Sequence, residues 1–372
     1  MTNLSGRNGM MAVCVTAALA ALGAESSHAA SQRTYVASYG DDAGACTLVA
    51  PCRSFAAALL ETLAGGEIIV LDAAGYAPVA IDRSVSIITP PGVFAGITAF
   101  SGDGVTITGT NLRVLLSGLT INGLGGANGV NVEASGSDIR LERVTISGFT
   151  LAGIDMYVGL TVGATRLRVA NSLIRANQYG IRVAGANDVL LDHVTVEEQS
   201  ASAVETWTNP RLHVRDSIFD RNGGFGLNAN GFGASGDPPM SMTVERSTVR
   251  RNASGGIRVT IGQADPAVRL AVTVVDSTVS ENGGKGVDAV CSDVSRAIVT
   301  LADSTISGNG WDGVAGAGTG CTLTLSHNVI AGNAGTSMVN STAGSFGSFG
   351  DNRVRGNGND TPSGTITMLP VR

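Results

Sequence analysis

Charged and aromatic residues recur through the middle of the chain at intervals of 23 to 30 residues. Carboxylate and guanidinium groups at such positions can act as acids, bases or charge stabilisers on a polysaccharide chain. The candidate catalytic residues are Asp155, Arg182, Glu205 and Arg258. Rings stack on sugars, while amides and carboxylates bind hydroxyl groups. The candidate substrate-binding residues are therefore Tyr157, Trp207, Asn228 and Asp288. Trp207 is expected to be exposed.

An ion-pair ladder is the competing interpretation of these positions. Asp155, Arg182 and Glu205 alternate in sign, and surface ion pairs between neighbouring repeats would contribute little to stability. Three longer segments, 158–164, 231–240 and 261–267, follow the strand that carries these residues and would wall a groove on the same face. Two interpretations of these residues therefore stand side by side, a glycan-binding groove and a ladder of ion pairs.

Asp276 and Asp303 are candidate metal ligands, because they hold equivalent positions in successive repeats. Two like charges one strand spacing apart would raise the pKa of one carboxyl group or attract a cation such as calcium. Calcium takes about six to eight oxygen ligands. The repeat places no third carboxylate beside the pair. The sequence therefore predicts no metal and no cofactor, with calcium as the alternative.

The elements that position these residues are repeats with a mean length of about 26 residues, which is typical of a solenoid. Each repeat contains a strand that ends on an apolar residue, which we call the anchor. The residue five positions before the anchor is apolar as well. Apolar residues seven positions earlier complete the period-2 pattern of a strand in all repeats but the last, which has Gly347. The ten anchors are Ile121, Ile146, Ile174, Val196, Phe219, Val249, Val279, Ile306, Ile330 and Val354.

Two polar columns accompany the anchors. An amide stands three residues after most of them, and amides stacked at the strand spacing of about 4.8 Å can hydrogen-bond along the stack. These amides belong to Asn177, Gln199, Asn222, Asn252, Asn282, Asn309, Asn333 and Asn357. A serine column extends the same argument to a second turn, at Ser217, Ser247, Ser277 and Ser304.

Composition excludes several classes of protein. The chain has 51 glycines among 372 residues, 15% charged residues and 4% aromatic residues, which favours short strands and tight turns over a helix-rich enzyme. The net charge of −6 opposes the basic surface that nucleic-acid binding needs, so no nucleic-acid partner is expected. We expect a monomer.

The first 29 residues have the pattern of an export signal, with Arg7, an apolar run and small residues before a cleavage site after Ala29. No later segment reaches the run of about 18 apolar residues that a transmembrane helix requires. We therefore expect a secreted or periplasmic protein. Its four remaining cysteines predict two disulfides in an oxidising compartment, Cys46 with Cys52 and Cys291 with Cys321.

The pattern V-x-D-S-T-V-S-x-N-G-x-x-G-V resembles the right-handed parallel β-helix of the pectin-lyase-like superfamily, over roughly residues 65 to 358. The resemblance implies an all-β solenoid whose relatives are lyases, hydrolases, epimerases and proteins without known activity. Residues 34–81 resemble the first segment of secreted bacterial β-helix proteins, in which a disulfide loop and an amphipathic helix cap the first coil. The predicted helix spans Ser54 to Leu63 and buries Phe55, Leu59, Leu60 and Leu63.

The expected organisation is a signal peptide at 1–29, a cap at 30–64, the β-helix at 65–358 and a tail at 359–372. A pectate-lyase type of site would need an arginine base, for which Arg182 or Arg258 qualifies, and an acidic calcium cluster, which that face lacks. The sequence therefore favours a protein that binds polysaccharide or a cell-surface glycan along one face of the solenoid. The alternative is a polysaccharide-modifying lyase, hydrolase or epimerase.

Overall fold

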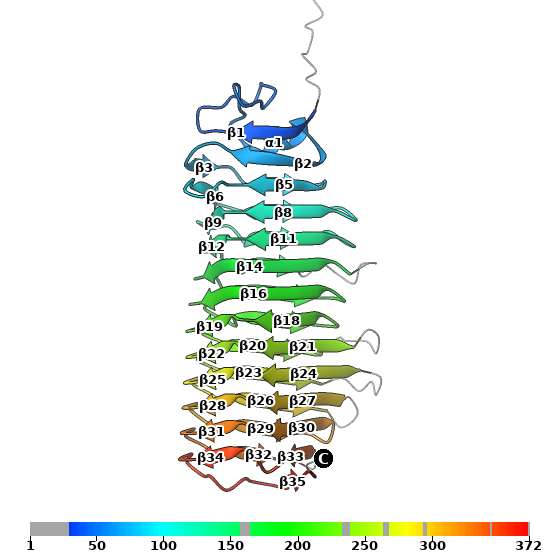
Figure 1. The fold of residues 1–372 in the computed structure, drawn as a ribbon, viewed down its shortest axis with the longest axis vertical. Coiled ribbons are helices and arrows are strands. Elements are labelled where there is room, and N and C mark those ends of the chain that lie inside the picture. Colours follow the sequence, from blue (N-terminus) through cyan, green and yellow to red (C-terminus); the bar gives the residue numbers. More distant parts are fainter. Residues whose placement is uncertain are drawn as a thin grey trace, which may run out of the picture.

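In the computed structural model the chain forms one long stack of coils, with the cap at one end and the C-terminal strands at the other (Figure 1). The structure describes residues 30–156, 164–232, 239–262, 268–292, 296–342 and 344–370. The predicted signal peptide lies outside this part of the chain. Strands of successive coils pair in parallel, which confirms the predicted β-helix. No helix in the described residues is long and apolar enough to cross a membrane.

Eleven of the described strands form the sheet that carries the candidate site residues. We call it the 11-stranded sheet. In chain order its strands are β4 (Val79–Ile81), β7 (Val105–Ile107), β10 (Asn128–Val132), β13 (Ala152–Met156), β15 (Tyr179–Ala184), β17 (Val204–Trp207), β20 (Phe225–Asn230), β23 (Gly255–Ile261), β26 (Val287–Cys291), β29 (Val314–Ala317) and β32 (Met338–Asn340).

The other 24 described strands form a sheet that bends at a corner into two rows, and β14 and β16 run through both rows. The first row consists of β1 (Ser31–Val36), β2 (Thr62–Val70), β5 (Val85–Ile88), β8 (Arg113–Ser117), β11 (Asp138–Glu142), β14 (Arg166–Arg175), β16 (Asp188–Glu197), β18 (Arg211–Arg215), β21 (Met240–Glu245), β24 (Arg269–Val275), β27 (Arg296–Ala302), β30 (Cys321–Ser326), β33 (Ser345–Ser348) and β35 (Thr367–Met368). The second row consists of β3 (Ala74–Tyr76), β6 (Ala95–Ala99), β9 (Leu119–Gly123), β12 (Thr145–Ser147), β19 (Ile218–Asp220), β22 (Thr248–Arg250), β25 (Thr278–Ser280), β28 (Thr305–Ser307), β31 (Val329–Ala331) and β34 (Arg353–Arg355).

Alternation along each strand explains how the coil closes around its core. In β24, Leu270, Val272 and Val274 are buried, while the residues between them point outward. The 11-stranded sheet lies behind the first row in Figure 1, and both sheets bury their inward side chains in the same core. Outward residues at the same position in successive coils consequently form columns on a rigid surface.

The corner between the two rows uses a left-handed residue followed by a serine or asparagine. Asp276 and Asp303 both occupy this corner with φ 49°, so these two candidate metal ligands are turn residues. The backbone amide of Ser247 donates to Oγ of Ser277 at 3.1 Å, and that of Ser277 donates to Oγ of Ser304 at 3.2 Å. The predicted serine column is thus a hydrogen-bonded ladder.

The asparagine column forms a second ladder before the strands of the 11-stranded sheet. Nδ2 of Asn252 donates to Oδ1 of Asn282 at 2.9 Å, and Nδ2 of Asn282 donates to Oδ1 of Asn309 at the same distance. The backbone amides of Asn252 and Asn282 donate to the same oxygens. The ladder is buried, so each asparagine satisfies donors that the turn would otherwise leave unpaired. The predicted stacking is confirmed.

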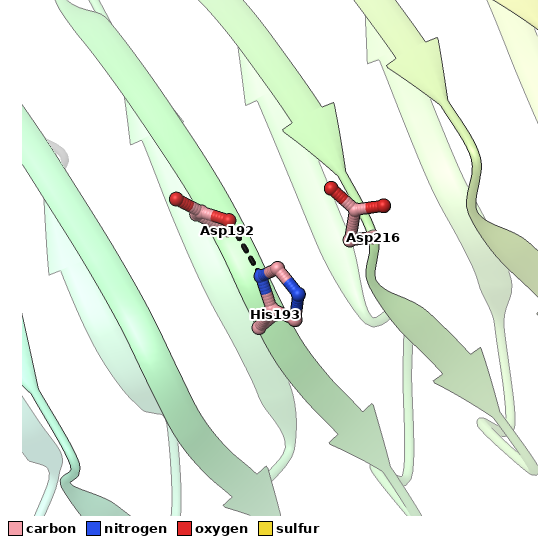
Figure 2. Close-up of side chains that lie close together, drawn as sticks. All are labelled: Asp192, His193 and Asp216. Atoms are coloured by element: carbon pink, nitrogen blue, oxygen red, sulfur yellow. Dashed lines mark hydrogen bonds and ion pairs between the residues drawn. The ribbon is translucent and has the colours of Figure 1, made fainter.

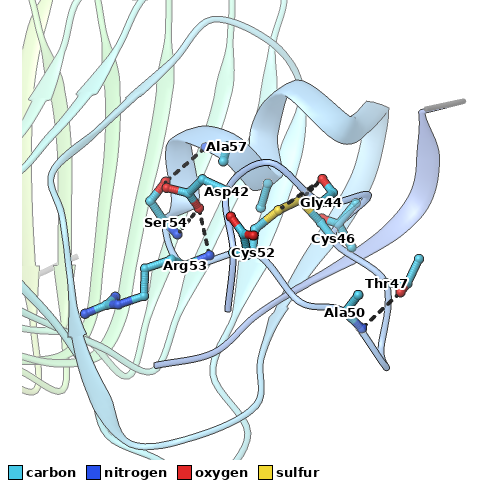
Figure 3. The surroundings of a disulfide bond; sticks show 12 residues. Asp42, Gly44, Cys46, Thr47, Ala50, Cys52, Arg53, Ser54 and Ala57 are labelled. Carbon is cyan, nitrogen blue, oxygen red and sulfur yellow. Dashed lines mark hydrogen bonds between the residues drawn. A yellow bond between two sulfur atoms is a disulfide. The ribbon is translucent and has the colours of Figure 1, made fainter. Parts of the chain in front are cut away.

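The N-terminal cap combines a disulfide loop with the one helix of the described chain, α1 (Phe55–Glu61). Cys46 and Cys52 are bonded, as predicted, with their Cα atoms 4.6 Å apart (Figure 3). The carboxylate of Asp42 accepts hydrogen bonds from the backbone amides of Arg53 and Ser54 at 2.7 and 2.8 Å. Oγ of Ser54 accepts from the amide of Ala57 and caps the helix.

The predicted burial of Leu60 and Leu63 is wrong. The helix ends at Glu61 and buries Phe55, Ala58 and Leu59, whereas Leu60 is 70% exposed. The spacing i, i+3, i+4 from Phe55 selects positions 58 and 59, and position 60 points away from them. Leu63 lies beyond the helix, in β2. The cap therefore covers the first coil with a narrower apolar face than predicted.

Cys291, at the end of β26, is bonded to Cys321, at the start of β30, with their Cα atoms 5.3 Å apart. This second predicted pair is confirmed, and it ties neighbouring coils at the corner between the two sheets. Replacing both cysteines by Ala is expected to lower the free energy of unfolding by about 3 kcal/mol, since the bond closes a loop of 30 residues in the unfolded chain.

Urea denaturation of the oxidised proteins measures this loss, and the exchange of Cys46 and Cys52 is the matched control. That pair closes a loop of only six residues, so its removal is expected to cost about 1 kcal/mol less. Equal losses from the two exchanges would show that constraint of the unfolded chain is not the main contribution of the Cys291–Cys321 bond.

Candidate functional site

The pairing of the 11-stranded sheet brings the predicted site residues into one column on its outward face. Arg182 lies in register with Asp155 on one side and with Glu205 on the other. The next register partners along the stack are Asn228, Arg258 and Asp288. Trp207 follows Glu205 by two residues and lies in register with Ala184. We call this surface the site face. Tyr157 lies outside the described residues.

Arg182 occupies the centre of the site face. Its Nη1 lies 3.4 Å from Oδ2 of Asp155, and the two side chains are 17% and 10% exposed. The guanidinium carbon is 5.4 Å from the ring centre of Trp207 and 5.5 Å from that of Tyr179. The ion-pair interpretation is therefore correct for the Asp155–Arg182 contact, and the same contact fixes a planar cation beside two rings.

Glu205 lies in register with Arg182 on the next strand, β17. Burial raises the pKa of its carboxyl group, and hydrogen bonds from Ser202 and Asn228 together with the charge of Arg182 partly oppose the rise. Nδ2 of Asn228 donates to Oε1 of Glu205 at 3.1 Å. A carboxyl group with a raised pKa can retain a proton closer to neutral pH and donate it as a general acid.

A second part of the site face lies three coils further along, where Arg258 and Asp288 line a groove of about 410 Å³. Nζ of Lys285 lies 2.8 Å from Oδ1 of Asp288, and the guanidinium carbon of Arg258 is 5.1 Å from the ring centre of Phe225. Trp311 lines the same groove and is 64% exposed. The sequence interpretation missed Trp311, Lys285 and Phe225, because none of them stands in the outward column. Trp311 and Lys285 belong to the turn, and Phe225 is the first residue of β20.

A family model described as the right handed beta helix region matches residues 103–294, which is more than half of the chain. The chain belongs to this right-handed β-helix family. A search of curated proteins found no match. The match covers the candidate residues from Asp155 to Asp288, and Trp311 lies beyond it.

Three solved β-helix structures are similar to the chain. The A-module of the mannuronan C-5 epimerase AlgE4 from Azotobacter vinelandii has a TM-score of 0.61 at 14% identity, over 82% of this chain and 91% of that chain. Pectate lyase Pel9A has a TM-score of 0.55 at 16% identity, over 89% and 80%. The periplasmic alginate epimerase AlgG has a TM-score of 0.54 at 12% identity, over 82% and 77%. At these identities the likeness establishes the β-helix fold alone.

The burial of Trp207 differs from the prediction. The indole is half-buried beside Arg182 instead of exposed. The strand position still points outward, but the guanidinium of the preceding coil covers part of the ring. The segments predicted to wall the site face, 158–164, 231–240 and 261–267, lie largely outside the described residues.

One group of three possible metal ligands occurs in the described chain, Asp192, His193 and Asp216, whose ligand atoms lie within 4.8 Å of one another (Figure 2). Arginines already neutralise both carboxylates. Nη2 of Arg215 lies 2.6 Å from Asp192, and Arg246 donates two hydrogen bonds to Asp216, at 2.9 and 3.0 Å. This group therefore does not fit a metal ion. The predicted pair Asp276 and Asp303 has no third acidic, His or Cys ligand among the described residues.

The ion pairs of Asp192 predict a pH-dependent contribution to stability. The hydrogen bond from Arg215 lowers the pKa of the Asp192 carboxyl group to about 2, below its value in an unfolded chain. The native state therefore binds fewer protons, and this contribution is present above about pH 4 and is lost as the pH falls towards 2.

Asp192→Asn is expected to reduce stability by about 1 kcal/mol at pH 7, after allowance for solvent screening, and by much less near pH 2. Urea unfolding of both proteins between pH 7 and pH 2 measures the difference. A difference that stays constant over this range would contradict the assignment.

Proposed function

We propose that the protein binds a polysaccharide along the site face. The arrangement of Arg182 carries the proposal, because a guanidinium held between Asp155 and the ring of Trp207 offers directed hydrogen-bond donors beside an aromatic surface. Sugars are bound by this combination of stacking and polar contacts. The rigid β-helix holds these groups in place, so that glycan binding does not require the entropy loss of ordering a loop.

The second part of the site face extends the same chemistry. Trp311 offers an exposed ring, and Lys285, Arg258 and Asp288 offer charged donors and acceptors around the groove. Arg182 and Arg258 lie three coils apart, or about 14 Å at the strand spacing. A linear glycan that follows the column would contact both parts at once.

A polysaccharide-modifying enzyme is the second candidate function, and Glu205 favours it. A half-buried carboxyl group with a raised pKa lies in register beside Arg182, which is the pairing of an acid with a charge stabiliser. The structural neighbours named as a pectate lyase and alginate epimerases agree with a glycan ligand.

A panel of polysaccharides, with and without calcium, distinguishes the two functions. The purified protein is tested for retention in affinity gels, for release of reducing ends and for absorbance of unsaturated uronides. Binding without turnover supports the binding function. Turnover that is lost in Glu205→Gln, while binding persists, supports the enzyme. Neither binding nor turnover on any glycan would overturn the proposal.

Trp207→Ala is expected to weaken glycan binding by about 1 to 3 kcal/mol, because the ring supplies a stacking surface. Isothermal titration with a glycan retained in the panel measures the loss, and thermal unfolding checks that the variant is folded. Phe100→Ala is the matched control, since Phe100 is 72% exposed and lies between β6 and β7, and β7 is four strands from the strand of Trp207 in the 11-stranded sheet. A large loss of stability with unaltered binding would instead assign Trp207 to packing.

The proposed setting of this function is the periplasm or the exterior of the cell, where both disulfides would form. Export with cleavage after Ala29 and a monomeric state remain predictions. Mass spectrometry of the exported protein and sedimentation analysis test these two predictions.

A further inference from the structure

We propose a second binding site, for an anionic polysaccharide, on the first row of the 24-stranded sheet. A groove of about 550 Å³ crosses the outward faces of β11, β14, β16, β18 and β21. This volume is in the range of small-ligand sites. We call it the arginine groove, after Arg140, Arg166, Arg168 and Arg211 in its lining. It lies on the other side of the core from the site face, so it goes beyond the proposed function.

Register places like charges side by side in the arginine groove. Arg140 on β11 pairs directly with Arg168 on β14, and like charges opposite one another destabilise a sheet. A neighbouring column contains Arg113, Arg166 and Arg211, with an aspartate on each strand between them. Arg140 donates to Asp138 through Nε at 3.3 Å and through Nη2 at 2.9 Å, and an anion bound between Arg140 and Arg168 would relieve the repulsion that remains.

The aspartates engage only part of each guanidinium. Arg168 donates to Asp192 through Nη2 at 3.1 Å, and Arg211 donates to Asp188 through Nη1 at 3.4 Å. A guanidinium has five N–H donors, and these two side chains are about half exposed. Donors on both arginines consequently remain available to a ligand carboxylate or sulfate, which arginine binds in a bidentate manner.

The arginine groove concentrates positive charge on a negative protein. Five arginines and two aspartates line it together with the adjoining hollow, whereas the whole chain carries −6. The adjoining hollow, of about 440 Å³, shares Asp138 and Arg140 and continues to Ser86 on β5. Together they cross seven strands, or about 29 Å. This length and charge suit a linear polymer with one negative group on each sugar.

The floor of the arginine groove favours a glycan over a membrane surface. Leu115 and Leu190 lie in the same column as Arg140 and Arg168 and are half-buried, so they offer apolar contact to the C–H groups of a sugar ring. No large apolar residue of the groove is among the exposed ones in the described chain, whereas insertion into a membrane needs such residues.

Isothermal titration with a galacturonate hexamer, at 50 and 500 mM NaCl, tests this site in the full chain. The variant Arg140→Glu/Arg168→Glu is expected to weaken binding at least tenfold, because it replaces two charge-assisted contacts by repulsion. The matched control is Arg269→Glu/Arg296→Glu, which reverses another pair of arginines in register, on β24 and β27, and changes the net charge equally. The control is expected to change the affinity less than threefold. Binding is expected to weaken at the higher salt concentration.

Three outcomes would overturn the arginine groove as a polyanion site. They are equal losses in the two charge-reversal variants, equal affinity for a neutral hexamer of glucose, and binding to vesicles of anionic phospholipid without binding to the hexamer. Trp207→Ala separates the two sites, since it is expected to leave hexamer binding at the groove unchanged. Loss of hexamer binding in Trp207→Ala, but not in Arg140→Glu/Arg168→Glu, would assign the ligand to the site face.

Discussion

Replacing Arg182 by Ala is expected to lower the free energy of unfolding by about 4 kcal/mol and to weaken glycan binding at the site face at least tenfold. The stability loss arises because Asp155, with its side chain 10% exposed, would lose the guanidinium at 3.4 Å. The binding loss arises because the donors beside Trp207 disappear. Urea unfolding and titration with a retained glycan measure the two effects.

The double variant Arg182→Ala/Asp155→Asn separates charge from packing. Removing the carboxylate charge as well is expected to restore about half of the lost stability, since a neutral amide is less costly to bury than a carboxylate that has lost its ion pair with Arg182. Glycan binding is expected to stay weak in the double variant. If the double variant is no more stable than Arg182→Ala, the cation contributes through its packing on the rings of Trp207 and Tyr179 instead.

Gly286→Ala is expected to cost about 3 kcal/mol, because the added methyl group overpacks a buried turn. A Cβ atom at position 286 would lie 2.6 Å from the carbonyl oxygen of Gly313 and 2.5 Å from Cγ2 of Ile306. It would also lie 2.9 Å from Nδ2 of Asn309, so a shift to relieve the clash would disturb the buried asparagine ladder.

Thermal and urea unfolding of Gly286→Ala measure this cost. Gly75→Ala is the matched control, because Gly75 lies in β3 and a Cβ atom there would have no neighbour within 4 Å. The control is expected to unfold at nearly the wild-type midpoint. A stability of Gly286→Ala equal to that of the control would show that successive coils can separate at this turn without loss.

The column of candidate site residues was predictable because position in the repeat becomes position in space. Hydrogen bonds between coils fix the register, so Asp155, Arg182 and Glu205 meet although 23 to 27 residues separate neighbouring members. The ladders follow for the same reason. Periodicity carried no such information about the cap, where the burial of Leu60 depends on where one short helix packs.

The missed residues lie outside the column of candidate site residues, or in turns where position in the repeat does not decide which residues make contact. Trp311 and Lys285 belong to the turn that follows the ladder, so their common groove depends on the path of that turn. Arg140 and Arg168 are 28 residues apart, as residues in neighbouring repeats are, but they lie on the 24-stranded sheet and outside the column of predicted site residues. The orientation of the ring of Trp207 depends on how its side chain packs against Arg182, and the periodicity of the sequence does not predict such packing.

Because the ladders keep a constant register, the molecule can be lengthened or shortened by whole coils. Asn222, Asn252 and Asn282 are each 30 residues apart and make equivalent bonds to the next asparagine. Excising residues 252–281 would join equivalent positions and set Asn222 against Asn282. The stack would shorten by about 4.8 Å. The site face would lose the one coil that carries Arg258. Gain or loss of a coil in evolution would thus change the number of sugar units spanned while the cross-section stays the same.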